Sequence, residues 1–372
     1  MALTIHSPNS NWDLWLSPTV SLSLIIEAET TNPSLTRSLS QFVLLVFRRS
    51  LLQEQLSYEL SQRPIGPGNQ IGPVSSTTLR VVDYAYYKTW VGARNDARGT
   101  PIYPQELAAT ISTVQGIDQS TPAYQLLSVS LERVMAVYQL VDDVIERADT
   151  RFDPADEQGQ DDLQQLWALL NPNRELRGMT GKWWVEVSTV HAVSISDRIT
   201  LTDLAVVPCS QLGFQGNNPA TDFRDLGTLA LDSLLFFART YGHRAVQVVE
   251  ESVEGGEYWY PMALGVMHMT AFALDLAKSR DLQLILLRSY QAPRDEGFSR
   301  SDQDPPNLGP FLAIASDLFL LFHLHWLRGG YTVMQFEQVS KEFQNALRPW
   351  IRRGVIDSRA LGWETGNGGK VE

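Results

Sequence analysis

The chain has 372 residues, 44% of them hydrophobic, which is enough to bury a large core. Its length fits two or three domains, or one helical domain with an N-terminal extension. The formal net charge of −12 argues against non-specific attraction to nucleic acid or anionic lipid. Cys209 is the single cysteine, which excludes internal disulfides and multi-cysteine zinc sites and suits a reducing compartment.

The first 120 residues form a region to which the sequence assigns no role. Residues 34–62 have apolar side chains at helical spacing, which favours packing on a core over binding a partner. The stretch 63–79 is rich in Gly, Pro, Ser and Thr, a composition typical of a linker. We therefore expect an irregular or helical N-terminal extension over 1–120, with a linker near 63–79.

Helical periodicity dominates the rest of the chain. The long stretch 122–148 has Pro122 at its first position, where a helix tolerates proline. The acidic stretch 153–161 is expected to be a connector. Further helices are expected at 105–115, 162–171, 226–252, 259–277, 281–290, 308–327 and 332–352. The pattern predicts an all-α multi-helix bundle without a large sheet, followed by a loose C-terminal tail at 353–372.

Residues 185–208 differ in character from their surroundings. The run Val-Ser-Ile-Ser-Asp-Arg-Ile-Thr-Leu-Thr alternates and is β-branched, which favours a strand over a helix. A surface hairpin, a flexible loop and an error in the predicted gene structure are the alternatives. We expect this strand-like segment to be an insertion outside the helical core.

The segment from Phe311 to Leu327 is the most apolar candidate for a membrane span. It contains Asp317, His323 and His325, so a buried core helix is the better interpretation and no transmembrane segment is expected. The two histidines are two positions apart on this helix and point to different faces. We expect one of them to be packed and the other partly exposed, instead of a shared metal.

Signatures of covalent catalysis are missing. The stretch from Gly178 to Trp183 has the wrong spacing for a phosphate loop, and Trp183 replaces the Ser or Thr that would hold magnesium. Neither a Gly-x-Ser-x-Gly elbow nor a His-Glu-x-x-His pair is present. We expect no metal, no cofactor and no covalent chemistry of the chain's own.

The most informative stretch runs from Leu212 to Arg224 and reads Leu-Gly-Phe-Gln-Gly-Asn-Asn-Pro-Ala-Thr-Asp-Phe-Arg. Its glycines and its Asn-Asn-Pro predict a turn that leads into an apolar helix. Thr221 or Asp222 could cap that helix. We expect Arg224 in the first helical turn, where the helix dipole disfavours a cation.

Two interpretations of Arg224 remain open on this basis. The arginine could form an ion pair with Asp222, Asp225 or another carboxylate and so fix the turn. It could instead offer positive charge to a phosphate on a partner. Exposed ion pairs contribute only about 0–1 kcal/mol, which is a weak reason for a cation in an unfavourable place.

The motif resembles the signature of the ELMO domain, and most of all that of the stand-alone ELMO-domain (ELMOD) proteins. The resemblance continues in Leu163-Gln-Gln-Leu166-Trp167, in Tyr260-Pro261-Met262-Ala263 and in Met334-x-Phe336. It spans roughly 122–352 and implies an all-α ELMO domain at 121–352.

The resemblance implies a GTPase-activating protein for Arf and Arf-like small GTPases. Arg224 would be the catalytic arginine finger, while Gln215, Asn218 and Asp222 would order the turn or contact the partner. The GTPase would bring GTP and magnesium, so the chain itself needs no cofactor. We expect a cytoplasmic protein, with peripheral attachment to endomembranes through the GTPase as an alternative.

The sequence leaves two other functions open. One is a non-catalytic scaffold, such as a partner of DOCK-type Rac exchange factors. The other is a domain that binds a GTPase without activating it.

The chain departs from the family's pattern at a few positions. The family usually has Gly after the motif arginine, whereas this chain has Asp225, which could neutralise Arg224 or cap the helix. The family's Trp before the motif has counterparts in Trp183 and Trp184. His268 replaces an Asn of the family, and we expect it to serve packing.

Overall fold

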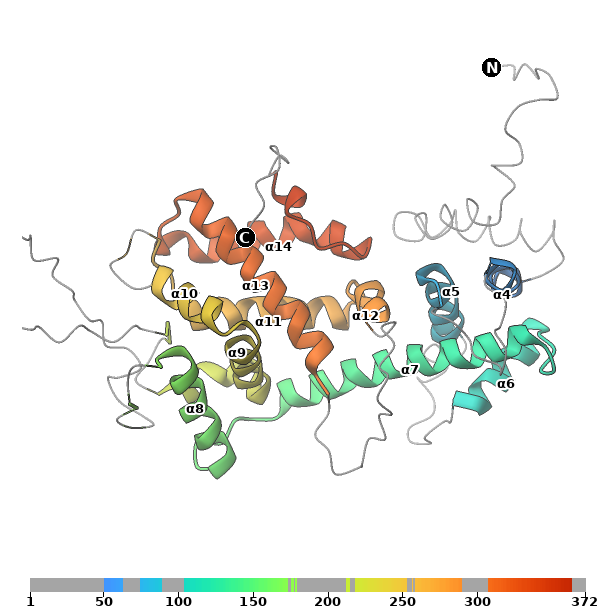
Figure 1. The fold of residues 1–372 in the computed structure, drawn as a ribbon, viewed down its shortest axis with the longest axis horizontal. Coiled ribbons are helices and arrows are strands. Elements are labelled where there is room, and N and C mark those ends of the chain that lie inside the picture. The colour runs from blue at the N-terminus through green and yellow to red at the C-terminus, as the bar shows by residue number, and fades with distance from the viewer. Residues whose placement is uncertain are drawn as a thin grey trace, which may run out of the picture. The chain divides into compact units, whose positions relative to one another are not determined.

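The computed structural model describes residues 50–62, 74–88, 104–172, 175–176, 178, 212–214, 218–252, 256, 258–289 and 307–362. Within these ranges all regular structure is helical, so the predicted all-α class is confirmed (Figure 1). The described residues divide between two compact units. One lies within Met1–Tyr138 and Leu287–Ser299, and the other within Gln139–Leu286 and Arg300–Glu372. The predicted insertion at 185–208 and the first part of the predicted helix 34–62 lie outside the described residues.

The first unit contains α4 (Leu51–Gln62), α5 (Ser76–Tyr86), α6 (Pro104–Gln115) and the beginning of α7 (Pro122–Asp149). Polar side chains join α4 to α5: the hydroxyl of Thr78 donates to Oε2 of Glu59 at 2.8 Å. Helix α5 begins inside the stretch that composition assigned to a linker near 63–79. Ser75 accepts a hydrogen bond from the Thr78 amide and caps this helix, so its Ser-Ser-Thr-Thr run is a helix start.

The second unit contains the end of α7 and the remaining helices. They are α8 (Glu157–Leu170), η3 (Pro219–Asp225), α9 (Gly227–Tyr241), α10 (His243–Glu251), α11 (Met262–Lys278), α12 (Gln283–Ser289, whose last residues belong to the first unit), α13 (Gly309–Gly329), η4 (Val333–Gln335), α14 (Phe336–Arg352) and η5 (Ser358–Leu361). Helix α13 packs against α11 and α9, while α8 packs against α9 (Figure 1). Within the predicted tail 353–372, η5 packs on α14.

The ends of several helices differ from the sequence-based predictions, most of all at α8 and between α9 and α10. Helix α8 begins at Glu157, inside the predicted acidic connector, because Asp156 accepts from the Gly159 amide and acidic residues favour a helix N-terminus. The predicted helix 226–252 is two helices, α9 and α10. Gly242 separates them with φ of +45°, a conformation that a helix interior does not allow.

Helix α13 is a core helix of the second unit. By length and composition it could cross a membrane, but 56% of its most apolar window is buried inside the protein. Phe319 meets Phe237 of α9 edge to face, with ring centroids 5.0 Å apart. His323 is fully buried and His325 is partly exposed, which confirms the prediction of one packed and one partly exposed histidine.

Candidate functional site

The predicted motif forms a short 3-10 helix ahead of α9. This helix, η3, contains Pro219–Asp225, and Oδ1 of Asn218 accepts from the Ala220 amide at 3.1 Å to cap it. Asn218 thus fixes the beginning of the bend that carries Arg224 and Asp222. Gln215 lies outside the described residues. The part that Asn218 and Asp222 play toward a partner remains a prediction.

Arg224 lies in the last turn of η3, so the prediction that it occupies the first turn of the next helix is wrong. Helix α9 begins only at Gly227, and its N-cap residue Leu226 provides no side-chain hydrogen bond. Thr221 does not cap α9 either, because its hydroxyl donates to the Asn218 carbonyl at 2.8 Å. The dipole of η3 itself favours a cation at its C-terminal end, where Arg224 lies.

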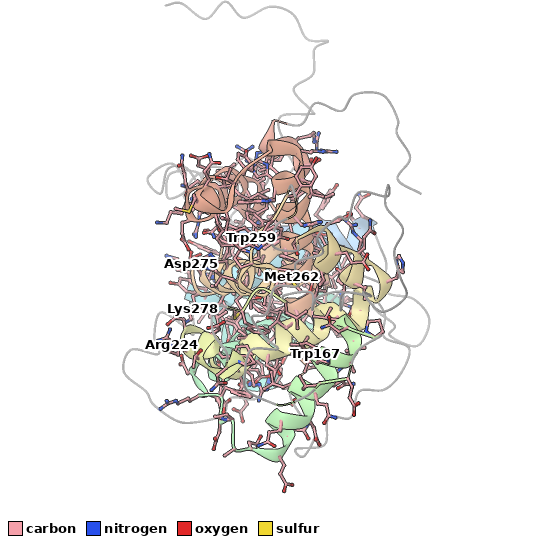
Figure 2. All side chains as sticks on the ribbon, turned by 90° about the vertical axis from the view of Figure 1, so that its left-hand side faces the viewer. Trp167, Arg224, Trp259, Met262, Asp275 and Lys278 are labelled. Atoms are coloured by element: carbon pink, nitrogen blue, oxygen red, sulfur yellow. The ribbon has the colours of Figure 1, made fainter. Side chains whose placement is uncertain are left out.

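The side chain of Arg224 is exposed to solvent, and Figure 2 shows it at the periphery of the ribbon. It forms no hydrogen bond or ion pair with any residue that the structure describes. Neither Asp222 nor Asp225 therefore forms the ion pair with Arg224 that the first interpretation expected. An unpaired guanidinium at the surface keeps all its donors for a group outside the chain.

Phe223 anchors the bend next to Arg224. Its side chain is 1% exposed and lies between two other rings. The Phe152 ring is 5.1 Å away at 84°, and the Phe214 ring is 6.0 Å away at 75°, so both contacts are edge to face. Successive residues of a 3-10 helix point about 120° apart, so burial of Phe223 directs Arg224 away from the core.

The segment Leu212–Phe214 attaches the motif to the start of α11. The Ala263 amide donates to the Leu212 carbonyl at 2.7 Å, which satisfies one of the free amides of that helix. Gly213 has φ of +82°, and a Cβ atom there would lie 2.3 Å from the Met262 nitrogen. Only glycine permits this approach.

Gly227 allows an equally close contact at the other end of the motif. It has φ of +51°, and a Cβ atom would lie 2.2 Å from the Thr150 carbonyl oxygen, at the end of α7. The chain therefore crosses tightly at this glycine. The bend that carries Arg224 is held on both sides by backbone contacts that no larger residue could make.

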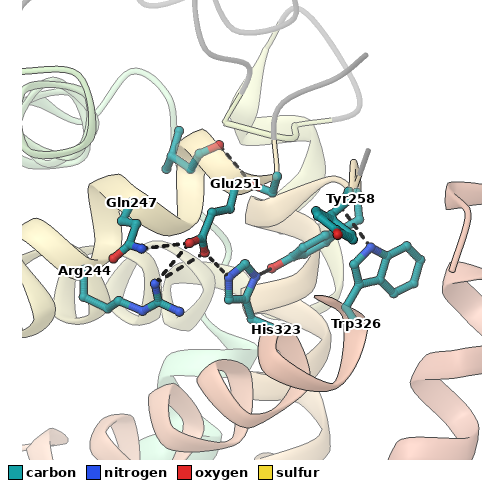
Figure 3. Close-up of polar contacts among 9 residues, drawn as sticks. Arg244, Gln247, Glu251, Tyr258, His323 and Trp326 are labelled. Atoms are coloured by element: carbon teal, nitrogen blue, oxygen red, sulfur yellow. Dashed lines mark hydrogen bonds and ion pairs between the residues drawn. The ribbon is translucent and has the colours of Figure 1, made fainter. Parts of the chain in front are cut away.

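A partly buried polar network lies next to the segment in front of α11 (Figure 3). Nε2 of His323 lies 2.7 Å from Oε2 of Glu251, and Nδ1 lies 2.8 Å from the Tyr260 hydroxyl. Gln247 donates to Oε1 of Glu251 at 2.8 Å, and Arg244 lies 3.4 Å from the same carboxylate. Tyr260 precedes the Pro261–Ala263 stretch against which Gly213 packs.

Burial and hydrogen bonding shift the pKa values in this network. Burial lowers the pKa of His323, and the hydrogen bond with Glu251 opposes only part of that shift. Burial raises the pKa of Glu251, but hydrogen bonds from His323 and Gln247 and the charge of Arg244 outweigh it and leave the value lowered. Burial also raises the pKa of Tyr260 well above its ordinary value.

Comparison with known proteins places the motif in a family. The profile of a family described as "ELMO/CED-12 family" matches residues 142–340. This chain belongs to the ELMO/CED-12 family. No solved structure matches the chain.

Several curated proteins named for the ELMO domain resemble the chain. ELMO domain-containing protein 2 of Mus musculus is 29% identical over 42% of the chain and 44% of its own length. ELMO domain-containing protein 1 of Mus musculus is 24% identical over 66% of the chain and 71% of its own length. ELMO domain-containing protein B of Dictyostelium discoideum is 22% identical over 72% of the chain and 80% of its own length.

Within this ELMO/CED-12 domain, sequence reasoning missed some of the residues that shape the site. Phe223 belonged to the motif but had no assigned role, although an aromatic residue beside an expected surface arginine signals an anchor. Glu251 and His323 lie 72 positions apart, and no spacing rule connects them. His268 packs near Phe336, with ring centroids 5.3 Å apart, which fits the expected packing role.

Proposed function

We propose that this chain is a GTPase-activating protein for an Arf or Arf-like small GTPase, with Arg224 as its arginine finger. The observation that supports this proposal is the exposed guanidinium of Arg224, unpaired among the described residues and carried on a fixed bend. An arginine finger stabilises the charge that develops on the transferred phosphoryl oxygens, and is worth roughly 10³–10⁵ in rate. Membership of the ELMO/CED-12 family agrees with this role.

The chemistry requires nothing more from the chain than placement of one cation. The GTPase supplies GTP, magnesium and the attacking water, so the activator needs no cofactor. The planar guanidinium offers forked donors that match phosphate oxygens, whereas a lysine offers a single point charge. Asn218 and Phe223 hold the bend from which this group projects.

Single-turnover GTP hydrolysis on a panel of purified Arf and Arf-like proteins tests the proposal. We expect the wild-type chain to accelerate hydrolysis by at least one GTPase, and Arg224→Ala and Arg224→Lys to lose most of that acceleration. Arg353→Ala is the matched control, because Arg353 is another exposed arginine. Full activity of Arg224→Ala would show that Arg224 is not the finger.

Complex formation with GDP and aluminium fluoride adds a second test. This pair mimics the phosphoryl group in transfer, so a finger arginine should strengthen binding of the GTPase in that state. We expect wild type, but not Arg224→Ala, to bind the GTPase more tightly with aluminium fluoride than with GDP alone. Equal binding in both states would instead indicate a domain that binds a GTPase without activating it.

A further inference from the structure

Hydrogen bonds from Thr228 and Arg147 join the end of α7 to the beginning of α9. The Thr228 amide donates to the Thr150 carbonyl at 2.9 Å, and the Thr228 hydroxyl donates to the Arg147 carbonyl at 2.9 Å. The Arg147 side chain donates in turn to Asp232, one helical turn beyond Thr228. We call these contacts the α7–α9 clamp.

The Arg147–Asp232 pair is bidentate. Nε of Arg147 lies 2.7 Å from Oδ2 of Asp232, and Nη2 lies 2.7 Å from Oδ1. The Arg147 side chain is 37% exposed and that of Asp232 is 19% exposed. The hydrogen bond with Asp232 raises the pKa of Arg147. Two parallel bonds fix orientation as well as distance between the two helices.

The clamp also satisfies backbone groups that the helices leave free. The last carbonyl groups of an α-helix have no partner within the helix, and Arg147 contributes one of these at the end of α7. Thr228 occupies the first turn of α9, and its hydroxyl donates a hydrogen bond to this carbonyl of Arg147. Gly227 makes the approach possible, since a side chain there would strike the Thr150 carbonyl.

We infer that Thr228 and Asp232 are positioning residues for Arg224, an inference that rests on the proposed function. Thr228 follows Arg224 by four residues, and buried side chains flank Arg224 on both sides, Phe223 directly before it and Leu226 in the turn that leads to Thr228. A tilt at the beginning of α9 is therefore carried directly to the guanidinium. The clamp sets the direction in which Arg224 projects from the domain.

The expected loss in rate is larger than the expected loss in stability, which favours a positioning role for the clamp over a purely stabilising one. Loss of this pair should lower stability only modestly even though its geometry is bidentate, because the pair is partly exposed and therefore screened by solvent. A catalytic group misplaced by about 1 Å can lose on the order of 10²-fold in rate. The same loosening of the clamp should therefore affect catalysis far more than folding.

The test uses Thr228→Val, which keeps the shape but loses the hydroxyl donor, and Thr228→Ser, which keeps the donor. Asp232→Asn is a second variant that leaves Thr228 intact. With the most responsive GTPase, we expect Thr228→Val and Asp232→Asn to lower the maximal stimulated rate by about 10- to 100-fold, with little change in the half-saturating concentration. Thr228→Ser should stay within about threefold of wild type.

Thr110→Val is the matched control. The Thr110 hydroxyl donates to the Glu106 carbonyl of its own helix at 2.9 Å, in the other unit. This variant should keep the wild-type rate. Thermal unfolding of every variant shows that the rates are compared between folded proteins.

A double substitution tests whether the clamp acts through Arg224. Thr228→Val should slow stimulated hydrolysis in the wild-type background and add nothing to Arg224→Ala, because the group it positions is already gone. An equal loss in both backgrounds would mean that Thr228 acts elsewhere, and the inference would fall. Wild-type rates in both Thr228→Val and Asp232→Asn would overturn it as well.

Amide hydrogen exchange of the isolated chain separates failure of the clamp from failure of the proposed function. We expect Thr228→Val to speed exchange at η3 and the first turn of α9, while Thr228→Ser leaves exchange unchanged. If wild type stimulates no GTPase, the proposed function fails and takes the positioning role with it. If wild type is active but exchange in Thr228→Val is unchanged, the clamp alone is wrong.

Discussion

The hydroxyl of Tyr260 lies 2.8 Å from Nδ1 of His323, and both side chains are buried. On the other side of the ring, Nε2 lies 2.7 Å from the carboxylate of Glu251 (Figure 3). A neutral histidine with its proton on Nε2 satisfies both neighbours, since Nε2 donates to Glu251 and Nδ1 accepts from Tyr260. A second proton on Nδ1 would remove the acceptor of the Tyr260 hydroxyl, so this arrangement favours the neutral ring, in agreement with the pKa of His323 that burial lowers.

The protein should lose stability as the pH falls below about 6.5, the ordinary pKa of histidine. Burial lowers the pKa of His323 in the folded state, so the unfolded chain takes up a proton before the folded chain does. The pKa of Glu251 is also lowered, which extends the loss toward more acidic pH, below about 4.5. Urea unfolding at pH 7.5, 6.5 and 5.5 measures this dependence.

His323→Gln isolates the contribution of this ring. Glutamine provides a donor NH₂ group and an acceptor oxygen but does not titrate, so the free energy of unfolding should fall less between pH 7.5 and 5.5 than in wild type. His268 and His325 also have pKa values lowered by burial, so some dependence should remain. An unchanged dependence in His323→Gln would show that His323 does not titrate on unfolding in this range.

Much of the helical framework could be predicted from apolar spacing. The predicted helix 122–148 is α7 (Pro122–Asp149), and the predicted helix 308–327 is α13 (Gly309–Gly329). Both are long and strongly periodic, so packing and local preference agree. Helix α5 was missed because its Ser and Thr residues are typical of loops as well as of helix starts. The break at Gly242 depends on one glycine with positive φ, which apolar spacing does not reveal.

Only those site residues that lie within the motif from Leu212 to Arg224 were predicted from the sequence. Arg224 and Asn218 were identified from adjacent residues. The burial of Phe223 against Phe152, by contrast, joins positions 71 apart in the sequence. The hydroxyl of Thr228 meets the Arg147 carbonyl across 81 positions. Such contacts are set by how helices pack, so a single sequence cannot predict them.

Gly227→Ala should destabilise the protein far more than Gly330→Ala. Both glycines have positive φ, +51° and +60°. At Gly330 an added Cβ would meet nothing within 4 Å, so we expect only the left-handed backbone cost of about 1–2 kcal/mol. At Gly227 the Cβ would also strike the Thr150 carbonyl oxygen at 2.2 Å, and we expect a loss of at least about 3 kcal/mol. Urea unfolding compares the two, and similar losses would contradict the steric argument.

Asp281→Asn should cost more stability than Asp275→Asn. Asp281 is 9% exposed and accepts from two arginines of α14, Arg348 at 2.8 Å and Arg352 at 2.7 Å. Asp275 also pairs with Arg348 but is 62% exposed. We expect losses of about 2 kcal/mol for Asp281→Asn and less than about 1 kcal/mol for Asp275→Asn. Equal midpoints in thermal unfolding would mean that burial does not strengthen the Asp281 contacts.

Asp225→Asn should increase activation of the GTPase without changing stability. Asp225 is exposed and forms no hydrogen bond or ion pair with the residues that the structure describes, so its loss should change the free energy of unfolding by less than about 0.5 kcal/mol. Its negative charge adjoins the guanidinium that is proposed to meet a phosphate. Removal of that charge should raise stimulated hydrolysis about 2- to 10-fold at low salt and less at high salt, where screening is stronger.

Glu132→Gln is the control for this prediction, because it removes an exposed carboxylate from the first unit and should leave the rate unchanged. A lower rate for Asp225→Asn would indicate that the carboxylate assists the finger or contacts the partner.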